Sequence, residues 1–197
     1  MNLTRITDRS AAEIQHVADA LTLLPFIPIE PLALADVGSG GGVPGIPLAI
    51  ARPDLRITLI ESTKKKAVLL SGLVASLNLQ NVSVLDQRAE QIARGPLRES
   101  FDIVVARAVG QLAWLAEWCL PLVKKGGTFL AMKGEKVHEE IPLAQRPIRQ
   151  LGGGELIVHP IELPGTAHHV IVEIPKLAKT DAKYPRDPTT TRGNPLK

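Results

Sequence analysis

The sequence predicts an α/β fold built on one mostly parallel sheet. Strand-like and helix-like segments alternate through roughly the first two-thirds of the 197 residues, and two strand-like segments then follow one another. Alternation requires parallel strands joined by right-handed crossovers. The closing pair can form a hairpin, which puts an antiparallel strand at the sheet edge. We therefore expect a Rossmann-like sheet of seven strands.

The individual elements follow from apolar runs and from capping residues. The predicted strands cover residues 32–37, 56–61, 82–85, 101–106, 128–132, 156–163 and 169–174. A capping box, with Ser10 as the N-cap and Glu13 at N3, opens the first helix, and Pro25 limits it. We expect Pro47 to be the first residue of the second helix and Ser62 to cap the third, which runs to about residue 77. Further helices are expected over 111–120 and 136–150.

Composition excludes several classes of protein. The chain is 45% hydrophobic and 22% charged, which is typical of a soluble globular protein, and it has no apolar run long enough to cross a membrane. We expect no secretory signal, because the N-terminal stretch lacks an apolar core. The single cysteine, Cys119, excludes a disulfide framework and a cysteine-based metal site. A reducing, cytoplasmic compartment without a metal cofactor is therefore expected.

Charge divides the chain into two parts. We expect one domain over residues 1–175 and a basic, Pro-containing tail over residues 176–197. The tail has six Lys or Arg residues and two Asp, a net charge of +4, whereas the rest of the chain is close to neutral. Such a tail is typical of contact with a polyanion such as nucleic acid. Charge alone equally favours a solvated, partly disordered tail.

A glycine-rich turn follows the first predicted strand, in the sequence Asp36-Val-Gly-Ser-Gly-Gly-Gly-Val-Pro-Gly45. Glycine lets the backbone turn sharply and approach a ligand closely. In an open parallel sheet, ligands bind beyond the carboxyl ends of the strands. Glu61 ends the second strand, where a carboxylate can accept hydrogen bonds from both hydroxyls of a ribose. The pattern favours a nucleotide-like ligand over a turn that serves the fold alone.

The residues of this turn narrow the choice of ligand. Counted from Gly38, the dinucleotide motif G-x-G-x-x-G requires glycine where the chain has Val43, and the P-loop motif is absent. Asp36 is unfavourable beside a pyrophosphate. A sulfonium ligand with an amino-acid end tolerates that carboxylate, which attracts its ammonium group.

Two more strand ends carry candidate residues. After the third strand, we expect Ala89 and Glu90 to contact an adenine ring through their backbone, although Glu90 also suits the first turn of a short helix. After the fourth strand, Arg107 has planar donors that can orient a base or a cofactor. On spacing alone, a surface ion pair is the simpler interpretation of Arg107.

The turn after the fourth strand also bears on the acceptor of a methyl group from a sulfonium donor. It lacks the Asp/Asn-Pro-Pro-aromatic sequence typical of exocyclic amine methylation, and the chain has no cysteine-proline turn that would serve C5 of a pyrimidine. N7 of guanine fits better, because its lone pair is available without deprotonation. Such an enzyme needs alignment of the reactants rather than a general base, so we assign no catalytic residue.

These motifs resemble those of one known family. The stretch Asp36 to Ile50 closely resembles the signature of the ribosomal RNA small subunit methyltransferase G family, also called glucose-inhibited division protein B. Further similar blocks are Asn2-Leu-Thr4, His16-Val-Ala-Asp19, Leu59-Ile-Glu-Ser62 with Lys65-Lys66, Phe101-Asp102, Ala106-Arg-Ala108, Lys133-Gly134, Tyr184-Pro-Arg186 and Asn194-Pro-Leu196. The resemblance covers essentially the whole chain.

The resemblance implies a class I S-adenosylmethionine-dependent methyltransferase that acts on N7 of a guanine in 16S ribosomal RNA, near the decoding region. It implies contacts with S-adenosyl-L-methionine at Gly38, Gly40, Val43, Glu61, Ala89, Glu90 and Arg107. The candidates for the RNA face are His16, Arg107, Lys133 and Arg186, although an isolated histidine beside an apolar helix stripe is more often structural. The expected partner is 16S RNA or the small ribosomal subunit, with no membrane contact, and we expect a monomer.

Members of that family usually have further helical sequence before the Asn2-Leu-Thr4 block, so we expect a shortened N-terminal helical cap. Two alternatives remain. One is a methyltransferase of the same fold that acts on a small molecule or a protein, which would not need a basic tail. The other is a non-catalytic RNA-binding assembly factor, which would not need an intact glycine turn with Asp36 and Glu61.

Overall fold

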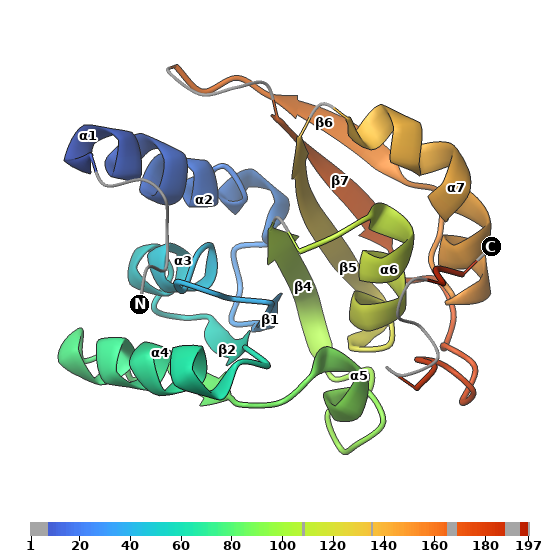
Figure 1. The fold of residues 1–197 in the computed structure, drawn as a ribbon, viewed down its shortest axis with the longest axis horizontal. Helices are drawn as coiled ribbons and strands as arrows, with labels where there is room; N and C mark the ends of the chain where they lie inside the picture. The colour runs from blue at the N-terminus through green and yellow to red at the C-terminus, as the bar shows by residue number, and fades with distance from the viewer. Residues whose placement is uncertain (1–7, 108, 135, 165–168, 188–193, 197) are drawn as a thin grey trace.

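The computed structural model describes residues 8–107, 109–134, 136–164, 169–187 and 194–196. A seven-stranded sheet in the order β3-β2-β1-β4-β5-β7-β6 runs through the molecule, with helices on both faces (Figure 1). The first five strands are parallel, and β7 lies antiparallel between β5 and β6. The predicted α/β sheet, its seven strands and the closing hairpin are therefore confirmed.

The strands lie within a few residues of the predicted ranges. Their bounds are β1 Ala33–Val37, β2 Arg56–Ile60, β3 Val82–Leu85, β4 Phe101–Arg107, β5 Val123–Gly134, β6 Ile157–Ile161 and β7 His169–Pro175. The largest difference is in β5, which begins five residues earlier than expected. Gly126 has a φ of 88° and the β4–β5 register shifts at this point, so the glycine pair bends the strand instead of ending it.

The helices and short helical turns are α1 Arg9–Ala12, η1 Glu13–Ala18, α2 Asp19–Leu21, η2 Leu24–Phe26, α3 Gly45–Ala51, α4 Lys64–Ser76, α5 Ala89–Ile92, α6 Leu112–Cys119 and α7 Val137–Gln150. The segments α1, η1 and α2 are continuous, and η1 has π-helical hydrogen bonding. No helix in the described part of the chain is both long enough and apolar enough to cross a membrane.

Three predicted helix starts are wrong. The N-cap of the first helix is Asp8, whose carboxylate accepts a hydrogen bond from Ala11 N at 2.7 Å, so the helix begins before the predicted Ser10 cap. Asp is as good an N-cap as Ser, and it comes first along the chain. Helix α3 begins at Gly45 rather than Pro47; proline fits the first turn because that turn needs no N–H from it. The N-cap of α4 is Thr63 rather than Ser62.

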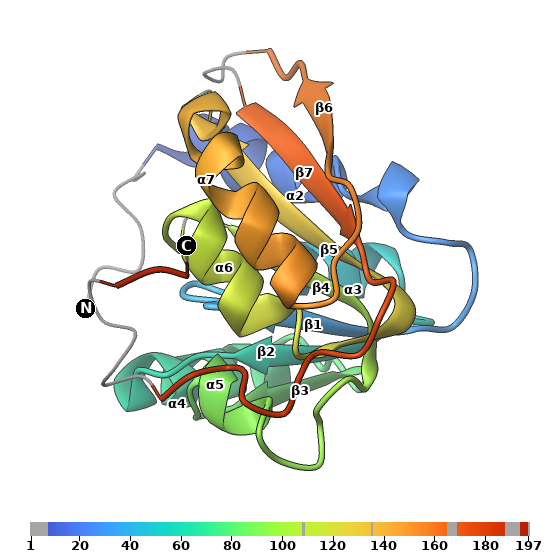
Figure 2. The ribbon, with the colours of Figure 1, turned by 90° about the vertical axis from the view of Figure 1, so that its right-hand side faces the viewer.

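Two apolar clusters cover the two faces of the sheet. Alternate residues of β1 point to opposite faces, so Leu34 packs with Leu48 of α3, while Val37 lies with Leu115 of α6 on the other face. Figures 1 and 2 show α1 to α4 on one side of the sheet and α5 to α7 on the other. Asp36, one residue from Val37, therefore points toward the face that carries α3.

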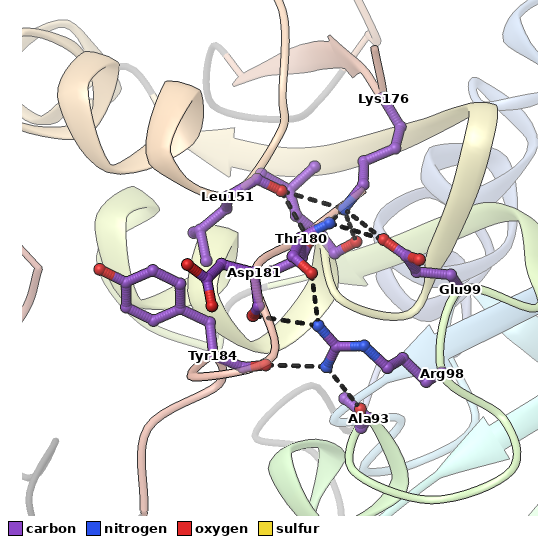
Figure 3. Close-up of polar contacts among 9 residues, drawn as sticks. Ala93, Arg98, Glu99, Leu151, Lys176, Thr180, Asp181 and Tyr184 are labelled. Atoms are coloured by element: carbon purple, nitrogen blue, oxygen red, sulfur yellow. Dashed lines mark hydrogen bonds and ion pairs between the residues drawn. The ribbon is translucent and has the colours of Figure 1, made fainter. Parts of the chain in front are cut away.

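The C-terminal segment is packed onto the domain, at least over the described residues 176–187. The side chain of Lys176 is fully buried, and its Nζ donates to Leu120 O at 2.7 Å and to Leu151 O at 3.0 Å, and also to the Thr180 hydroxyl (Figure 3). Glu99 Oε1 lies 3.5 Å from the ammonium group. Burial lowers the pKa of Lys176 to about 8, against the opposing effect of Glu99.

Two arginines hold the same segment from the main domain. Arg98 donates to Thr180 O at 2.7 Å, to Asp181 O at 3.1 Å and to Tyr184 O at 2.8 Å (Figure 3). Arg94 donates to the next carbonyl in the segment, that of residue 185, at 2.9 Å. Figure 2 shows the segment running from β7 toward α5. The described residues 176–187 of the predicted tail are therefore attached to the domain.

Arg186 completes this attachment through an ion pair with Glu117 of α6. Its Nε and Nη2 donate to the two carboxylate oxygens at 2.8 and 2.7 Å, and its backbone N–H donates at 2.9 Å. The side chain of Glu117 is fully buried. Three donors directed at one buried carboxylate give Arg186 a structural function, and its contact with RNA stays a prediction.

Arg186→Ala is expected to reduce the free energy of unfolding by about 3 kcal/mol, because it leaves the buried carboxylate of Glu117 without its partner. Urea unfolding at neutral pH measures the change. Adding Glu117→Gln should recover part of the loss, since it removes the unpaired charge. Lys183→Ala, at the exposed pair with Asp181 in the same segment, is the control and should leave the midpoint nearly unchanged. A wild-type midpoint for Arg186→Ala would contradict the structural function.

Candidate active site

A cavity of about 170 Å³ opens at the carboxyl ends of β1, β2 and β3. Its lining combines backbone from the glycine turn with polar and apolar side chains: Val37, Gly38, Ile60, Ser62, Gln87, Arg88, Ala89, Glu90, Val109 and Trp118. This is the edge of a parallel sheet at which ligands bind. The predicted residues Gly38, Ala89 and Glu90 line the cavity together, whereas Gly40, Val43, Glu61 and Arg107 lie outside this lining.

The glycine turn brings the backbone to the cavity wall. Gly38 has a φ of 74°, and a Cβ at this position would lie 2.8 Å from a methyl of Val109. Gly38 N and Ser39 N both donate to Ile60 O, at 2.8 and 3.1 Å, which ties the turn to the end of β2. A side chain at position 38 would therefore both strain the backbone and fill space at the cavity.

Glu61 braces the turn from the neighbouring strand. Its two carboxylate oxygens accept hydrogen bonds from Gly40 N at 3.0 Å and from Thr63 N at 2.7 Å. The residue is 5% exposed and lies between Ile60 and Ser62, which both line the cavity. Each oxygen keeps a second lone pair for a further donor. Glu61 thus combines a structural function with the position expected of a ribose acceptor.

Asp36 is a buried carboxylate beneath the turn. It is 1% exposed, and its Oδ2 accepts a hydrogen bond from Gly45 N at 3.0 Å. Within the described residues, Oδ1 has no hydrogen-bond partner. Burial raises the pKa of Asp36 to about 7, against the hydrogen bond from Gly45, the nearby Ser39 hydroxyl and the charge of Arg107. That hydroxyl donates to the backbone carbonyl of Asp36 at 2.8 Å. An acceptor atom left unsatisfied at a ligand edge indicates a site that a cationic or donor ligand would complete.

Arg107 lies at the end of β4 and faces the N-terminal helix. Its guanidinium donates to Gln15 O at 2.8 Å and to Asp19 Oδ2 at 2.7 Å, and Nη2 lies 3.0 Å from His16 Nδ1. The structure therefore brings together two of the four residues predicted for the RNA face, His16 and Arg107. The simpler interpretation of Arg107 as a member of an ion pair is confirmed by its contact with Asp19.

Lys133 lies on the opposite face of the sheet from Arg107. Met132 is the β-partner of Arg107, and Lys133 follows it in β5, so the two side chains point in opposite directions. Lys133 Nζ donates to Gly110 O at 2.7 Å and lies 2.8 Å from Glu140 Oε2 of α7. With 10% of its side chain exposed, Lys133 connects β5 to the helices on this face.

Several residues of the site were not anticipated from the sequence. Trp118 lines the cavity from α6, and its ring stacks on Trp114 with centroids 6.4 Å apart. Asp19 and His169 lie close to Arg107 through tertiary contacts. Asp19 ends the family-like block His16-Val-Ala-Asp19, but the block gave it no function, and no sequence pattern indicated His169. In the described part of the chain, no group of three or more His, Cys, Asp or Glu residues is arranged to hold a metal ion.

Comparison with known proteins identifies the family. The family described as rRNA small subunit methyltransferase G, GidB, matches residues 1–167. The chain belongs to this family. Curated relatives with the same description support it: the protein from Roseiflexus sp. strain RS-1 is 44% identical over 187 residues, covering 94% of this chain and 80% of the relative. The Staphylococcus aureus strain Newman protein is 42% identical over 198 residues, covering 100% and 83%.

Solved structures confirm the class I S-adenosylmethionine-dependent methyltransferase fold of this GidB family member. The M. jannaschii protein TYW2 in complex with AdoMet has a TM-score of 0.63 and 19% identity, covering 86% of this chain and 77% of that one. A SAM dependent methyltransferase from Aquifex aeolicus has a TM-score of 0.61 and 17% identity, covering 87% and 95%. At these identities the likeness concerns the fold alone.

Asp36→Asn is expected to raise the free energy of unfolding more at pH 8 than at pH 5. Between the ordinary carboxyl pKa of 3.8 and about 7, native Asp36 retains a proton that the unfolded chain releases, so this group's contribution is lost as pH rises through that window. The upper limit of this gain in the free energy of unfolding is about 4 kcal/mol. Chemical unfolding at both pH values measures the effect.

Asp54→Asn is the control, because the pKa of this exposed carboxylate is lowered by its hydrogen bond with Arg52. It should produce no gain at pH 8. An equal effect of Asp36→Asn at pH 5 and pH 8 would contradict a raised pKa at Asp36.

Proposed function

We propose that this protein transfers the methyl group of S-adenosyl-L-methionine to N7 of a guanine in 16S ribosomal RNA. One observation carries the proposal: in a member of the rRNA small subunit methyltransferase G family, the strand-end cavity is lined by the start of the glycine turn, which follows a buried carboxylate, Asp36, whose Oδ1 has no hydrogen-bond partner in the described residues. A ligand that carries a sulfonium and an ammonium group satisfies this acceptor.

The residues present fit such a cofactor. Gly38, Ala89 and Glu90 line the cavity, and Trp118 adds an aromatic wall suited to a purine ring. Glu61 retains acceptor capacity for ribose hydroxyls beside this cavity. When bound, the cofactor supplies an electrophilic methyl group. The chain supplies the binding surface and shields the reacting atoms from water.

The acceptor chemistry requires positioning and no proton removal. N7 of guanine has an in-plane lone pair and no hydrogen, so its attack leaves no proton for a base to accept. The chain therefore has to hold the base so that N7 is in line with the methyl group. Arg107 and His16 are suited to this, since they lie together at the carboxyl end of β4, and a guanidinium can donate to O6 of guanine.

A basic rim beside the cavity supports an RNA substrate. Lys64 and Lys65 are exposed at the start of α4, two and three residues after Ser62 of the cavity lining. No carboxylate among the described residues lies within ion-pair distance of either. Lysines at a helix N-terminus oppose the helix dipole, so this placement costs stability that an anionic partner recovers. The expected partner of this rim is thus 16S RNA or the small subunit. A cytoplasmic location and a monomeric state stay predictions.

The test is transfer of labelled methyl to small ribosomal subunits and to 16S RNA that lack base modifications, with mapping of the labelled nucleotide. Label at N7 of a single guanine is the expected result. Asp36→Asn should weaken cofactor binding roughly tenfold or more, because it removes an interaction with a charged group. Tryptophan fluorescence reports this affinity, since the ring of Trp118 lines the cavity and Trp114 stacks on it.

The outcomes separate the alternatives. Cofactor binding without labelled RNA favours a methyltransferase with a small-molecule or protein substrate. RNA binding without cofactor binding favours a non-catalytic assembly factor. Either result would overturn the proposed reaction. Comparison of naked RNA with assembled subunits then shows which of the two is the substrate.

Substituting both Lys64 and Lys65 with Gln is expected to weaken RNA binding. It should also reduce the slope of log affinity against log salt by roughly 0.7 to 0.9 for each RNA phosphate that the variant no longer neutralises. The matched control substitutes Lys125 and Lys179, which are exposed at the opposite ends of the strands. The control should keep the wild-type slope. Equal slopes for the two double variants would rule out the basic rim as an RNA-binding surface.

A further inference from the structure

We propose that Asp19 is a positioning residue for methyl transfer, and that it acts by holding Arg107, beside His169, at the edge of the sheet where the RNA base arrives. This inference rests on the proposed function and adds two residues to it: Asp19, to which the family-like block gave no function, and His169, which no sequence pattern indicated. It is carried by a network of side chains from three separate elements: α2, the end of β4 and the start of β7.

The carboxylate of Asp19 is shared between two partners. Its Oδ2 accepts a hydrogen bond from Arg107 Nη1 at 2.7 Å, and its Oδ1 lies 2.8 Å from His169 Nε2. The three side chains are only 13, 21 and 15% exposed, in the order Asp19, Arg107 and His169. The hydrogen bond from Arg107 fixes the direction of the guanidinium, whereas the contact with His169 is an ion-pair distance. Low exposure makes these contacts stronger than the same contacts in water.

The sheet register places the network on one face. Arg107 pairs with Met132 of β5, and Met132 pairs with Ile171 of β7. His169 is two residues before Ile171, so it points to the same face as Arg107. This face also carries Asp36, whose pKa is influenced by the charge of Arg107. The network therefore lies at the edge that bears the unsatisfied carboxylate, rather than at a remote part of the surface.

The π-helical segment η1 explains how the N-terminal helix reaches this network. It spans Glu13–Ala18, immediately before Asp19, and π-helical turns occur often at functional sites. Gln15 O accepts a hydrogen bond from Arg107 Nη1 at 2.8 Å, and His16 Nδ1 lies 3.0 Å from Nη2. One helical segment thus surrounds the guanidinium with acceptors. Asp19 is the member of this set that brings a full negative charge.

The negative charge of Asp19 suits the reaction. The lone pair of guanine N7 forms a bond to the methyl carbon, the carbon–sulfur bond breaks with its electrons on sulfur, and the positive charge passes to the base. No proton is released. An uncompensated Arg107 would oppose the arrival of positive charge at this edge. By neutralising Arg107 while fixing its direction, Asp19 lets the guanidinium orient the base without that repulsion.

The experiment compares Asp19→Asn with the matched control Glu13→Gln. Both remove one negative charge from the same helical region, but Glu13 pairs with Arg9 at a site where its side chain is 60% exposed. We expect Asp19→Asn to slow single-turnover methyl transfer roughly 10- to 100-fold, the effect of a small misplacement of reacting groups. Cofactor affinity should stay within about twofold of wild type. Glu13→Gln should transfer methyl at the wild-type rate.

A merely structural function for Asp19 predicts a different result. If Asp19 only tethers the helix, amide hydrogen exchange over residues 13–21 will accelerate in Asp19→Asn along with the fall in rate. Positioning predicts that protection is retained. It also predicts that Asp19→Asn has little further effect in an Arg107→Lys background, because both changes act through one guanidinium. An unchanged rate, a loss of helix protection or additive effects in the double variant would each overturn the proposal.

Failure of the proposed reaction is distinguishable from failure of this inference. NMR signals of the Arg107 guanidinium N–H groups report its restraint in the free protein. They should broaden in Asp19→Asn and remain sharp in Glu13→Gln. Wild-type protein that transfers no methyl to 16S RNA would overturn the proposed function. Unaltered guanidinium signals in Asp19→Asn would overturn the positioning of Arg107 by Asp19 even if the wild type is active.

Discussion

The buried carboxylate of Asp36 is the constraint on which the arrangement of the site depends. It lies in β1, the middle one of five parallel strands in a sheet covered on both faces, and its hydrogen bond from Gly45 N fixes the start of α3 over the strand end. A Cβ at Gly45 would lie 2.9 Å from Asp36 Oδ2 and 2.3 Å from Leu59. The short, glycine-rich turn is therefore required by this contact, and the exposed turn backbone that lines the cavity follows from it.

The alternation of side chains along a strand explains why two cations at this edge of the sheet, Arg107 and Lys133, have different functions. Successive residues of a strand point to opposite faces. Arg107 consequently faces the N-terminal helix, whereas Lys133 faces α6 and α7 and pairs with Glu140. The two cations are neighbours in the sheet but belong to different surroundings. Arg107 is available at the site, whereas Lys133 joins the sheet to the helices that cover it.

Basic residues near the C-terminus stabilise the fold, although their net charge suggests a tail that binds nucleic acid. Lys176 is fully buried among carbonyl oxygens, and Arg186 is paired with the buried Glu117. Arg98 attaches the same segment from the domain by donating to three of its carbonyl groups. Hydrogen bonds to otherwise unsatisfied backbone carbonyls explain why cations are favoured in this segment.

The sheet class, the approximate strand ranges, the hairpin and the glycine turn with Asp36 and Glu61 could be predicted from the sequence, because these depend on local periodicity and on backbone constraints at glycine. The sequence also placed Gly38, Ala89 and Glu90 at the strand ends that line the cavity. Only the tertiary structure decided the partners of Arg107, the entry of Trp118 into the cavity wall and the burial of Lys176. The contact of Arg107 with Asp19 joins residues 88 positions apart, and that of Lys176 with Leu151 joins residues 25 positions apart. They depend on which faces of distant elements meet, and a one-dimensional pattern of charge or hydrophobicity carries no information about that.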